Sequence, residues 1–149
     1  MVSDEDYLWA VWLEGQQEEK KYNLSECMCK DTPILLKTEH WLKQYFAKEN
    51  PSIKDISFKL DGTVFQNKVW ELLCQIPYGT TVSYKDLAQE VAKYFHKDKM
   101  SAQAIGGAVG RNPIAILIPC HRVIGKNGSL VGYGGGLHYK EFLLQHENT

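Results

Sequence analysis

Residues 101–123 read SAQAIGGAVGRNPIAILIPCHRV, and this stretch decides how the second half of the chain is organised. Ser101 is a residue type that caps helices, and Ala102–Val109 has the length and composition of a short helix that follows such a cap. The uninterrupted apolar run 114–118 predicts a buried strand or extended segment. The stretch therefore joins a capped helix to a segment that lies in the core.

A cysteine leaves this buried segment beside two basic side chains. Pro119 ends the apolar run, and Cys120 is followed by His121 and Arg122. Positive neighbours and hydrogen-bond donors favour a thiolate, which is the strongly nucleophilic form of cysteine. Cys120 is therefore a candidate nucleophile. A core cysteine with an incidental histidine remains an alternative, because free cysteine is commonly buried.

Glycines are concentrated in two places. Residues 106–110 hold three glycines where a helix is expected, although glycine costs about 1 kcal/mol per helix position relative to alanine. They indicate either close packing against another helix or a helix face small enough to enter the DNA minor groove, which is about 6 Å wide. Residues 132–136 (GYGGG) indicate either a flexible linker or a shaped loop whose backbone amides approach a flat ligand.

Upstream of this stretch the pattern is helical. The apolar stripe from Phe65 to Ile76 predicts one helix, which Pro77-Tyr78-Gly79 ends. Ser83 can cap a second helix, with Asp86 at the capping-box position. These helices and the one after Ser101 suggest a helix-turn-helix.

Downstream, the residues after Cys120 predict a hairpin and a closing helix. Val123-Ile124 and Leu130-Val131 flank the turn signal Asn127-Gly128, which favours a hairpin or wing. Leu137–Glu147 is predicted to be the last helix.

The N-terminal part mixes strand and helix signals. A buried strand is predicted over Tyr7–Leu13, a turn over Glu14–Lys21, and a helix that begins at Thr32-Pro33. The alternation of Ile56, Phe58 and Leu60 predicts another strand. Asp61-Gly62 is a turn signal, and we predict the boundary there, between an N-terminal part (1–61) and a C-terminal domain (62–149).

The composition of the chain limits the classes of function that it can have. The chain has 149 residues, 44% of them hydrophobic, and a net charge of −1. Residues 1–59 carry 8 Lys/Arg and 11 Asp/Glu, whereas residues 60–149 carry 9 and 7, so the second part is the better partner for a polyanion. No apolar run approaches the ~18 residues that span a membrane. The acidic start lacks the basic region of a secretory signal, and an intracellular, cytoplasmic protein is expected.

Four cysteines occur, and reduced thiols are expected in such a compartment. Cys74 lies in an apolar run and is predicted to be buried and inert. Cys27, Cys29 and His40 form a weak candidate for zinc, because structural zinc wants four ligands at characteristic spacings. We predict neither a metal nor a cofactor.

The second half of the chain resembles the O6-alkylguanine-DNA alkyltransferases, also called methylated-DNA–protein-cysteine methyltransferases. The resemblance runs from about Val64 to Glu147, and Pro-Cys-His-Arg-Val is its most specific element. The matching segments are Phe65-Gln66-Asn67-Lys68-Val69-Trp70, Ile76-Pro77-Tyr78-Gly79, Val82-Ser83-Tyr84, Ala104-Ile105-Gly106-Gly107-Ala108, Arg111-Asn112-Pro113, Ile118-Pro119-Cys120-His121-Arg122-Val123, and Gly132-Tyr133 through His146-Glu147.

The resemblance implies a role for each matching residue. Cys120 would be the nucleophile, His121 would take its proton through a water, and Glu147 would orient His121. Asn112 would brace the turn that carries Cys120. Tyr84 would donate a proton or hydrogen bond to the guanine ring.

Other matching positions would bind the substrate. Val123, Tyr133, Gly134 and Gly135 would line the guanine pocket. Residues on and around the glycine-rich helix would contact DNA in the minor groove: Ser101, Ala102, Gln103, Gly106, Gly107, Arg111 and Arg122.

Three departures from the family pattern stand out. Gln103 replaces an arginine that many members insert into the base stack. Gly134 occupies a position often filled by serine. The N-terminal part is shorter than the usual ribonuclease-H-like domain. The expected fold is thus α/β, with a reduced ribonuclease-H-like part before a C-terminal winged helix-turn-helix domain.

The predicted function is DNA repair by alkyl transfer. The alkyl group of O6-alkylguanine in double-stranded DNA, and of O4-alkylthymine, would pass irreversibly to Cys120 of a monomer that acts once, without a cofactor. Two alternatives are a binding module that recognises alkylated DNA, whose known relatives lack the cysteine, and a cysteine hydrolase.

Overall fold

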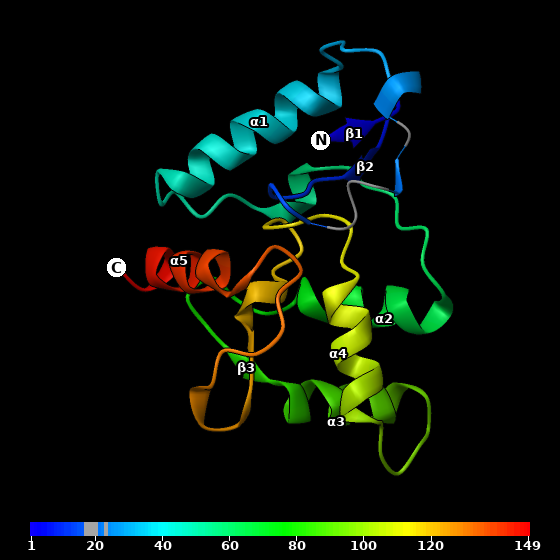
Figure 1. Ribbon diagram of the computed structural model, residues 1–149, viewed down its shortest axis with the longest axis vertical. Helices are drawn as coiled ribbons and strands as arrows, with labels where there is room; N and C mark the ends of the chain where they lie inside the picture. The colour runs from blue at the N-terminus through cyan, green and yellow to red at the C-terminus, as the bar shows by residue number, and fades with distance from the viewer. Residues whose placement is uncertain (17–20, 23) are drawn as a thin grey trace.

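Five α-helices and two pairs of short strands form the part of the chain that the computed structural model describes, residues 1–16, 21–22 and 24–149. Helix α1 (Pro33–Phe46) lies at one end of the molecule beside the N-terminal strands (Figure 1). Helices α2 (Val64–Leu73), α3 (Tyr84–Tyr94) and α4 (Ala102–Gly110) make up the other end. Helix α5 (Leu137–Asn148) lies between the two ends.

The N-terminal strands are shorter than the sequence predicts. Strand β1 (Val2–Ser3) pairs antiparallel with β2 (Leu8–Ala10), so the strand predicted over 7–13 is confirmed only in its middle. The strand predicted over 56–60 is wrong as a strand, since it is reduced to one parallel bridge between Leu8 and Phe58. The 3-10 turn Ile53–Asp55 comes so soon before it that little extended chain remains. Glu14 and Gly15 form the predicted turn, while residues 17–20 lie outside the described residues.

Side-chain caps set where the helices begin. The Thr32 side chain accepts from the Leu35 amide at the start of α1, and Ser101 accepts from the Ala104 amide at the start of α4. Ser83 and Asp86 form the predicted capping box of α3. An equivalent box of Thr63 and Gln66 starts α2, although sequence analysis had not found it. These caps satisfy backbone amides that the first helical turn leaves without partners.

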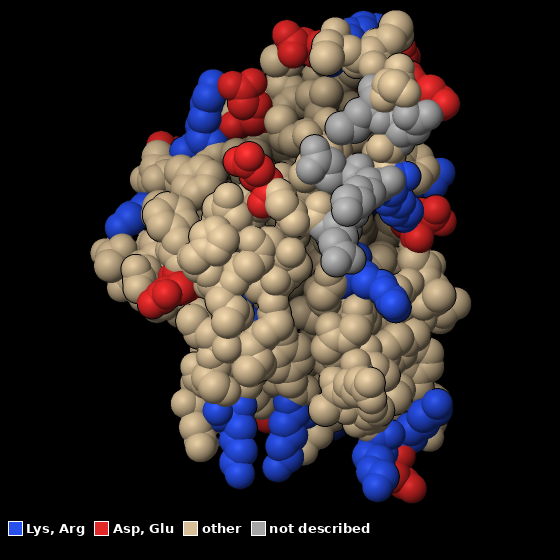
Figure 2. Space-filling view, in the orientation of Figure 1, with Lys and Arg blue, Asp and Glu red and all other residues tan. Residues whose placement is uncertain are grey.

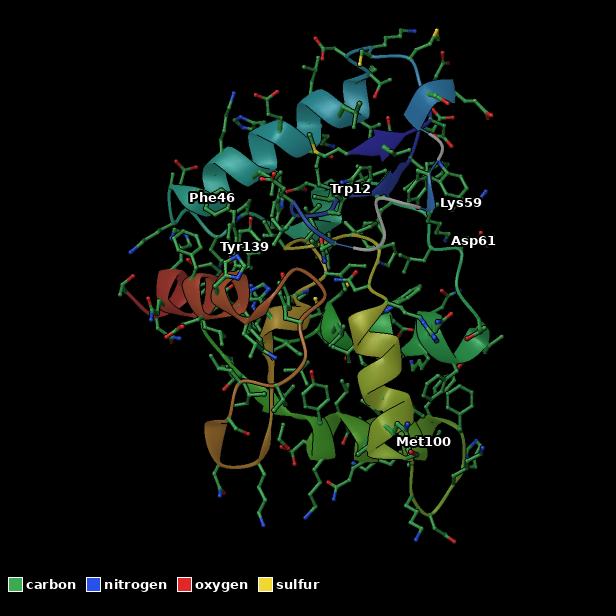
Figure 3. All side chains as sticks on the ribbon, in the orientation of Figure 1. Trp12, Phe46, Lys59, Asp61, Met100 and Tyr139 are labelled. Atoms are coloured by element: carbon green, nitrogen blue, oxygen red, sulfur yellow. The ribbon has the colours of Figure 1, made fainter. Side chains whose placement is uncertain are left out.

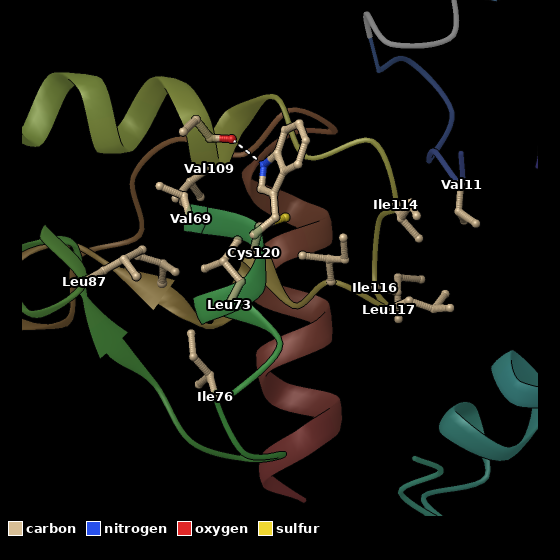
Figure 4. Packing of buried hydrophobic residues seen from close by; sticks show 14 of the residues in the cluster. Val11, Val69, Leu73, Ile76, Leu87, Val109, Ile114, Ile116, Leu117 and Cys120 are labelled. Atoms are coloured by element: carbon tan, nitrogen blue, oxygen red, sulfur yellow. Dashed lines mark hydrogen bonds between the residues drawn. The ribbon is translucent and has the colours of Figure 1, made fainter. Parts of the chain in front are cut away.

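One hydrophobic core joins the N-terminal part to the three helices. Leu8, Val11 and Tyr45 belong to the same buried cluster as Ile105 and Leu143. The indole of Trp70 on α2 donates to the Ala108 carbonyl of α4 at 2.8 Å, which ties the two helices together. Figure 4 shows this bond and places Cys120 inside the packed cluster. The core therefore reaches up to the candidate nucleophile.

The apolar segment 114–118 is buried, but it is not a strand. Its five residues are 0–4% exposed, and only Ile114 makes a bridge, to Val11. Ile116 has φ +70°, a left-handed conformation that a β-branched residue rarely adopts. Two hydrogen bonds hold this turn. The Ala115 amide donates to the Val11 carbonyl at 2.7 Å, and the Ile118 amide donates to the Ile114 carbonyl at 3.1 Å. The core thus enforces a strained turn directly before the active-site proline.

The predicted hairpin after Cys120 is also corrected. Strand β4 (Val123–Ile124) pairs in parallel with β3 (Val82–Ser83), and Leu130-Val131 forms no strand. A 3-10 turn, Lys126–Gly128, brings the Gly125 amide to the Ser129 carbonyl at 2.7 Å. Because β3 ends at Ser83, which is also the cap of α3, this pairing fixes the Cys120 turn against the start of α3 instead of against a hairpin.

Charge is unevenly distributed over the surface. Lys and Arg side chains project from the end of the molecule formed by α3 and the loop after it (Figure 2). A groove there is lined by Lys85, Lys93, Lys97, Lys99 and Met100, the last of which is labelled beside α4 in Figure 3. None of the described helices is long and apolar enough to cross a membrane.

Candidate active site

Cys120 sits at the start of a 3-10 turn, Cys120–Arg122, and is 6% exposed. The buried Asn112 side chain braces this turn from behind. Its Nδ2 lies 3.1 Å from the Cys120 Sγ and 2.8 Å from the Ile118 carbonyl, while its Oδ1 accepts from the Ile114 amide at 3.0 Å. An amide that donates to sulfur stabilises the thiolate, so Asn112 both holds the turn and favours the reactive form of Cys120.

His121 is oriented by a carboxylate. Its Nε2 lies 2.7 Å from Glu147 Oε1, and both side chains are fully buried. Because a carboxylate only accepts hydrogen bonds, Nε2 carries the proton and Nδ1 is the basic nitrogen. Burial lowers the pKa of His121, although the Glu147 charge opposes this, so the ring is neutral near pH 7 and can take a proton.

Glu147 is the centre of a larger buried network. Its carboxylate accepts from the Tyr45 hydroxyl at 2.7 Å and the Gly79 amide at 3.1 Å, besides His121. Arg122 donates to both of its oxygens, at 2.9 Å each. Burial alone would raise the pKa of Glu147, but the hydrogen bonds from His121 and Arg122 lower it overall. The C-terminal helix is thereby tied to α1 and to the turn after α2.

The position of Arg122 argues against the predicted DNA contact. The residue is 9% exposed, its Nη1 donates to the Ile76 carbonyl at 2.6 Å, and its Nε and Nη2 donate to Glu147. A guanidinium that is buried and held by three such bonds is poorly placed to reach a phosphate. Arg122 therefore binds the buried carboxylate of Glu147 as part of its hydrogen-bond network.

Two tyrosines lie near Cys120, Tyr84 of α3 and Tyr133 of the loop after β4. The Tyr84 hydroxyl, from the first residue of α3, donates to the carbonyls of Val131 and Gly132 at 3.2 and 3.3 Å. Burial, then the Cys120 charge, raises the pKa of Tyr84 to about 12, so its phenol stays a proton donor. Burial likewise raises the pKa of Tyr133, and Cys120 adds to this shift through its charge. Both phenols therefore lie close enough to Cys120 for its charge to raise their pKa values.

Three glycines shape this loop. Gly132 has φ +57° and Gly136 has φ +103°, conformations that favour glycine. A methyl group at Gly135 would meet Gln16 and Tyr139 at 3.3 Å, so this residue lets the loop pack closely on its neighbours. The shaped-loop interpretation of 132–136 fits these contacts better than a flexible linker. Gly134 is exposed, and Val123 is buried beside β3.

The glycines of α4 contribute to an exposed surface and are not needed for packing in the core. Gly107 and Gly110 lie on an exposed face with Gln103, while Ile105, Ala108 and Val109 pack inward. A Cβ added at any of the three glycines of α4 would meet nothing within 4 Å. Close helix packing is therefore not the reason for these glycines. They leave a helix face almost without side chains, bordered by the exposed residues Ser101, Ala102 and Arg111.

The N-terminal cysteines do not form the suggested zinc site. Cys27 and Cys29 line a cavity of about 620 Å³ near the start of α1, and His40 is not among its lining residues. No cluster of three or more metal-ligating side chains occurs among the residues that the structure describes. Cys74 is only partly buried, so the prediction of a buried thiol is confirmed only in part. Desolvation raises its pKa to about 11, which keeps the thiol protonated, as expected for an inert cysteine.

One charged residue at the site escaped sequence analysis. Lys140 of α5 is 0% exposed, and its Nζ reaches the carbonyl of Val131 in the active-site loop. The signal was present, because Lys140 shares one stripe of α5 with the buried residues Leu143 and Glu147. A lysine on a buried stripe indicates a specific partner.

Comparisons with known proteins agree with this site. Residues 64–149 match the family model described as the 6-O-methylguanine DNA methyltransferase, DNA binding domain. A methylated-DNA–protein-cysteine methyltransferase of Methanosarcina acetivorans is 40% identical over 150 residues, which span the whole chain and 90% of that protein. The Haemophilus influenzae protein of that name is 41% identical over 117 residues, 78% of this chain and 63% of its own length.

A solved structure extends the likeness to nearly the whole fold. A crystal structure of Mycobacterium tuberculosis OGT in complex with DNA superposes with a TM-score of 0.83 at 36% identity, covering 99% of this chain and 84% of the other. The mixed α/β fold is therefore shared along the entire length. With its family model covering more than half the chain, the protein belongs to the 6-O-methylguanine DNA methyltransferase family, and its activity is that of a methylated-DNA–protein-cysteine methyltransferase.

Proposed function

We propose that the protein repairs double-stranded DNA by moving the alkyl group of O6-alkylguanine, and of O4-alkylthymine, onto Cys120, once per molecule. The observation that carries the proposal is the pair of buried contacts on either side of the Cys120 turn: Asn112 donates to the Cys120 sulfur, and Glu147 accepts from the neighbouring His121. A single chain holds all of these residues, which supports action as a monomer. Figure 4 shows Cys120 among the packed core residues, and its exposed fraction of 6% supports a reaction shielded from water.

The transfer balances without a cofactor. His121 takes the thiol proton through a water, and the thiolate attacks the alkyl carbon. The new S–C bond forms as the C–O6 bond breaks, and the electron pair of that bond passes to the guanine. Tyr84 donates a proton or hydrogen bond to the departing guanine, and its pKa of about 12 keeps the phenol protonated and available as this donor. The thioether that remains on Cys120 has no route of release, so the reaction ends there.

The small-residue face of α4 is the proposed minor-groove surface. Glycines leave room for the walls of a groove about 6 Å wide. Because the target atom lies inside the duplex, the nucleotide must be flipped out, at a cost of a few kcal/mol. Gln103 would fill the gap, Arg111 would contact phosphates, and Val123, Tyr133, Gly134 and Gly135 would line the pocket for the flipped base. The lysines around α3 add a positive surface beside α4.

The arrangement of domains is also proposed. Helices α3 and α4 are both capped and pack on each other, as in a helix-turn-helix. The N-terminal part, residues 1–61, would be a reduced ribonuclease-H-like unit, and residues 62–149 would form the alkyltransferase domain. The shared core implies that the two units unfold together.

Stoichiometric labelling tests the central proposal. With excess methylated duplex oligonucleotide, each molecule is expected to gain one methyl group, because the sulfur is the final acceptor. Intact mass spectrometry with peptide mapping should locate it on Cys120, and Cys120→Ala should gain none. Multiple turnovers, or labelling at Cys27, Cys29 or Cys74, would contradict the proposed mechanism.

The residue at position 103 is expected to affect duplex DNA alone. Gln103 is exposed on the small-residue face and lacks the charge of an arginine. Gln103→Arg should tighten duplex binding, most visibly at low salt, where charge contributes most. Gln103→Ala should slow duplex repair but not reaction with the free base O6-benzylguanine. Equal duplex repair rates in the parent and Gln103→Ala would remove this residue from base flipping.

A further inference from the structure

In the part of the chain that the structure describes, three donors share one oxygen of Glu147. Its Oε1 lies 2.7 Å from the Nε2 of His121, 2.7 Å from the Tyr45 hydroxyl and 2.9 Å from the Nη2 of Arg122. An oxygen that already accepts from other donors is a weaker acceptor for each of them. The Tyr45 hydroxyl therefore competes with His121 for the same carboxylate oxygen.

Tyr45 is held firmly in this position. The residue is 1% exposed, and its ring stacks on Trp41 with centroids 5.6 Å apart and meets Tyr78 edge-on at 5.8 Å. The Nε2 of His146 lies 3.0 Å from its backbone carbonyl oxygen. Burial, then the hydrogen bond to Glu147, raises the pKa of Tyr45, so its phenol keeps the proton that it donates. The competition for Glu147 is thus a fixed feature of the folded protein.

We infer that Tyr45 is a positioning residue of the alkyl-transfer site, whose hydroxyl occupies Oε1 of Glu147 and thereby limits how strongly this carboxylate assists His121 in taking the thiol proton. The inference rests on the proposed function, since it concerns the same transfer. It gives helix α1 of the N-terminal part an effect on the chemistry as well as on stability, and this effect passes through Glu147 and His121.

The groups around His121 set the sign of the effect. Burial lowers the pKa of His121, the hydrogen bond and charge of Glu147 raise it, and the charges of Arg122 and Lys140 lower it. Tyr78, in the turn after α2, also interacts with the Glu147 charge, and burial raises the pKa of its phenol, which stays neutral. A carboxylate that accepts more strongly from His121 should therefore raise the pKa of this histidine.

The proposed reaction converts this pKa into a rate. Below the pKa of His121 the ring already carries a proton and cannot take that of the Cys120 thiol, so the rate should rise with pH until the ring is neutral. Above this pKa the rate should level off at a height set by how readily His121 accepts the thiol proton. Without the Tyr45 hydroxyl, both the pH of this break and the height of the plateau should increase together.

The test follows benzyl transfer from O6-benzylguanine to Cys120 by intact mass at a series of pH values. In Tyr45→Phe the plateau rate should rise by about threefold to tenfold, and the break should move up by the matching half to one pH unit, roughly, because one pKa unit corresponds to a factor of ten. Rates on the acidic side should coincide with those of the parent. Tyr7→Phe, at an exposed tyrosine, is the matched control and should keep the parental profile.

Stability gives a readout of the opposite sign. Tyr45→Phe loses a buried hydrogen bond, so its Tm should fall while its plateau rate rises. A merely structural role for the hydroxyl would lower both quantities, or leave the rate unchanged. The combination of a less stable protein and a faster reaction therefore distinguishes the proposed restraint from packing.

A second variant reverses the effect on the rate. Incorporating 3-fluorotyrosine at position 45 keeps the hydroxyl but makes it more acidic and a stronger donor, so the plateau rate should fall below that of the parent. This variant also decides the test if Tyr45→Phe fails to fold. A plateau that is unchanged or lower in Tyr45→Phe, or that does not fall with 3-fluorotyrosine, would overturn the inference. A parent that takes up no benzyl group would instead refute the proposed function.

Discussion

Exchanging Gly107 for arginine is expected to reduce repair of duplex DNA at least a hundredfold while sparing the reaction with O6-benzylguanine. The glycine lies on the exposed face of α4, and a Cβ there meets nothing within 4 Å, so the protein should fold normally. Arginine is even a better helix former than glycine, by about 0.5–1 kcal/mol. The loss would therefore come from a side chain that cannot enter the narrow groove.

Two matched variants control this experiment. Gly107→Ala adds the same helix propensity with little bulk and should retain most duplex repair. Gly107→Glu adds bulk with the opposite charge, and a similar loss in it would separate size from charge. Rates for duplex and free base are measured side by side, together with Tm. If Gly107→Arg loses both activities equally, the glycine serves folding.

The Glu147→Gln variant should have the largest effect on stability. Arg122 is 9% exposed and gives three of its donors to Glu147 and Ile76, so removal of the carboxylate leaves a buried guanidinium without its counter-charge. Breaking such a pair typically costs about 3–5 kcal/mol. Chemical denaturation should show this loss, and benzyl transfer should slow as well, because His121 loses its orienting partner.

Adding Arg122→Met to Glu147→Gln distinguishes the effect of the unpaired charge from the other effects of the substitution. In Glu147→Gln/Arg122→Met no uncompensated charge remains, so much of the stability should return while benzyl transfer stays slow. Recovery of neither would show that the cost lies elsewhere in the network, for example in the bonds of Glu147 to Tyr45 and Gly79. Recovery of both would remove Glu147 from the mechanism.

The pH dependence of stability provides a further check on the same variant. The pKa of Glu147 is held below its usual value of 4.5, so its stabilisation is present above that pH and is lost as the pH falls toward the folded-state value. Burial lowers the pKa of His121 below 6.5, so the unfolded chain also takes up this proton more readily as the pH falls. The free energy of unfolding of the parent should therefore decline below about pH 6.5. In Glu147→Gln the decline below pH 4.5 should be shallower.

Local signals predicted the helices well. The predicted caps Ser83 and Ser101 lie where the structure has them, and the helix predicted at Thr32-Pro33 is capped by Thr32, because a cap depends on a side chain and an amide only three residues away. The strands were predicted less well. Val123-Ile124 pairs with Val82-Ser83, about forty residues upstream. A local sequence pattern does not indicate which distant strand will pair with a given strand. The run 114–118 was likewise predicted to be a buried strand or extended segment and not a turn. Its turn depends on packing in the core, which forces Ile116 to adopt φ +70°.

The sequence by itself identified the family and predicted the candidate nucleophile and its neighbouring histidine, because Pro-Cys-His-Arg-Val and the glycine-rich helix are contiguous. Only the tertiary structure showed the surroundings of Arg122, for which the resemblance implies a DNA contact and which bonds a carboxylate 25 residues away. It also decided that the glycines of α4 face outward and that Lys140 reaches the loop carbonyls. The physical reason is that burial and hydrogen-bond partners depend on which distant segments meet, and one-dimensional spacing records only near neighbours.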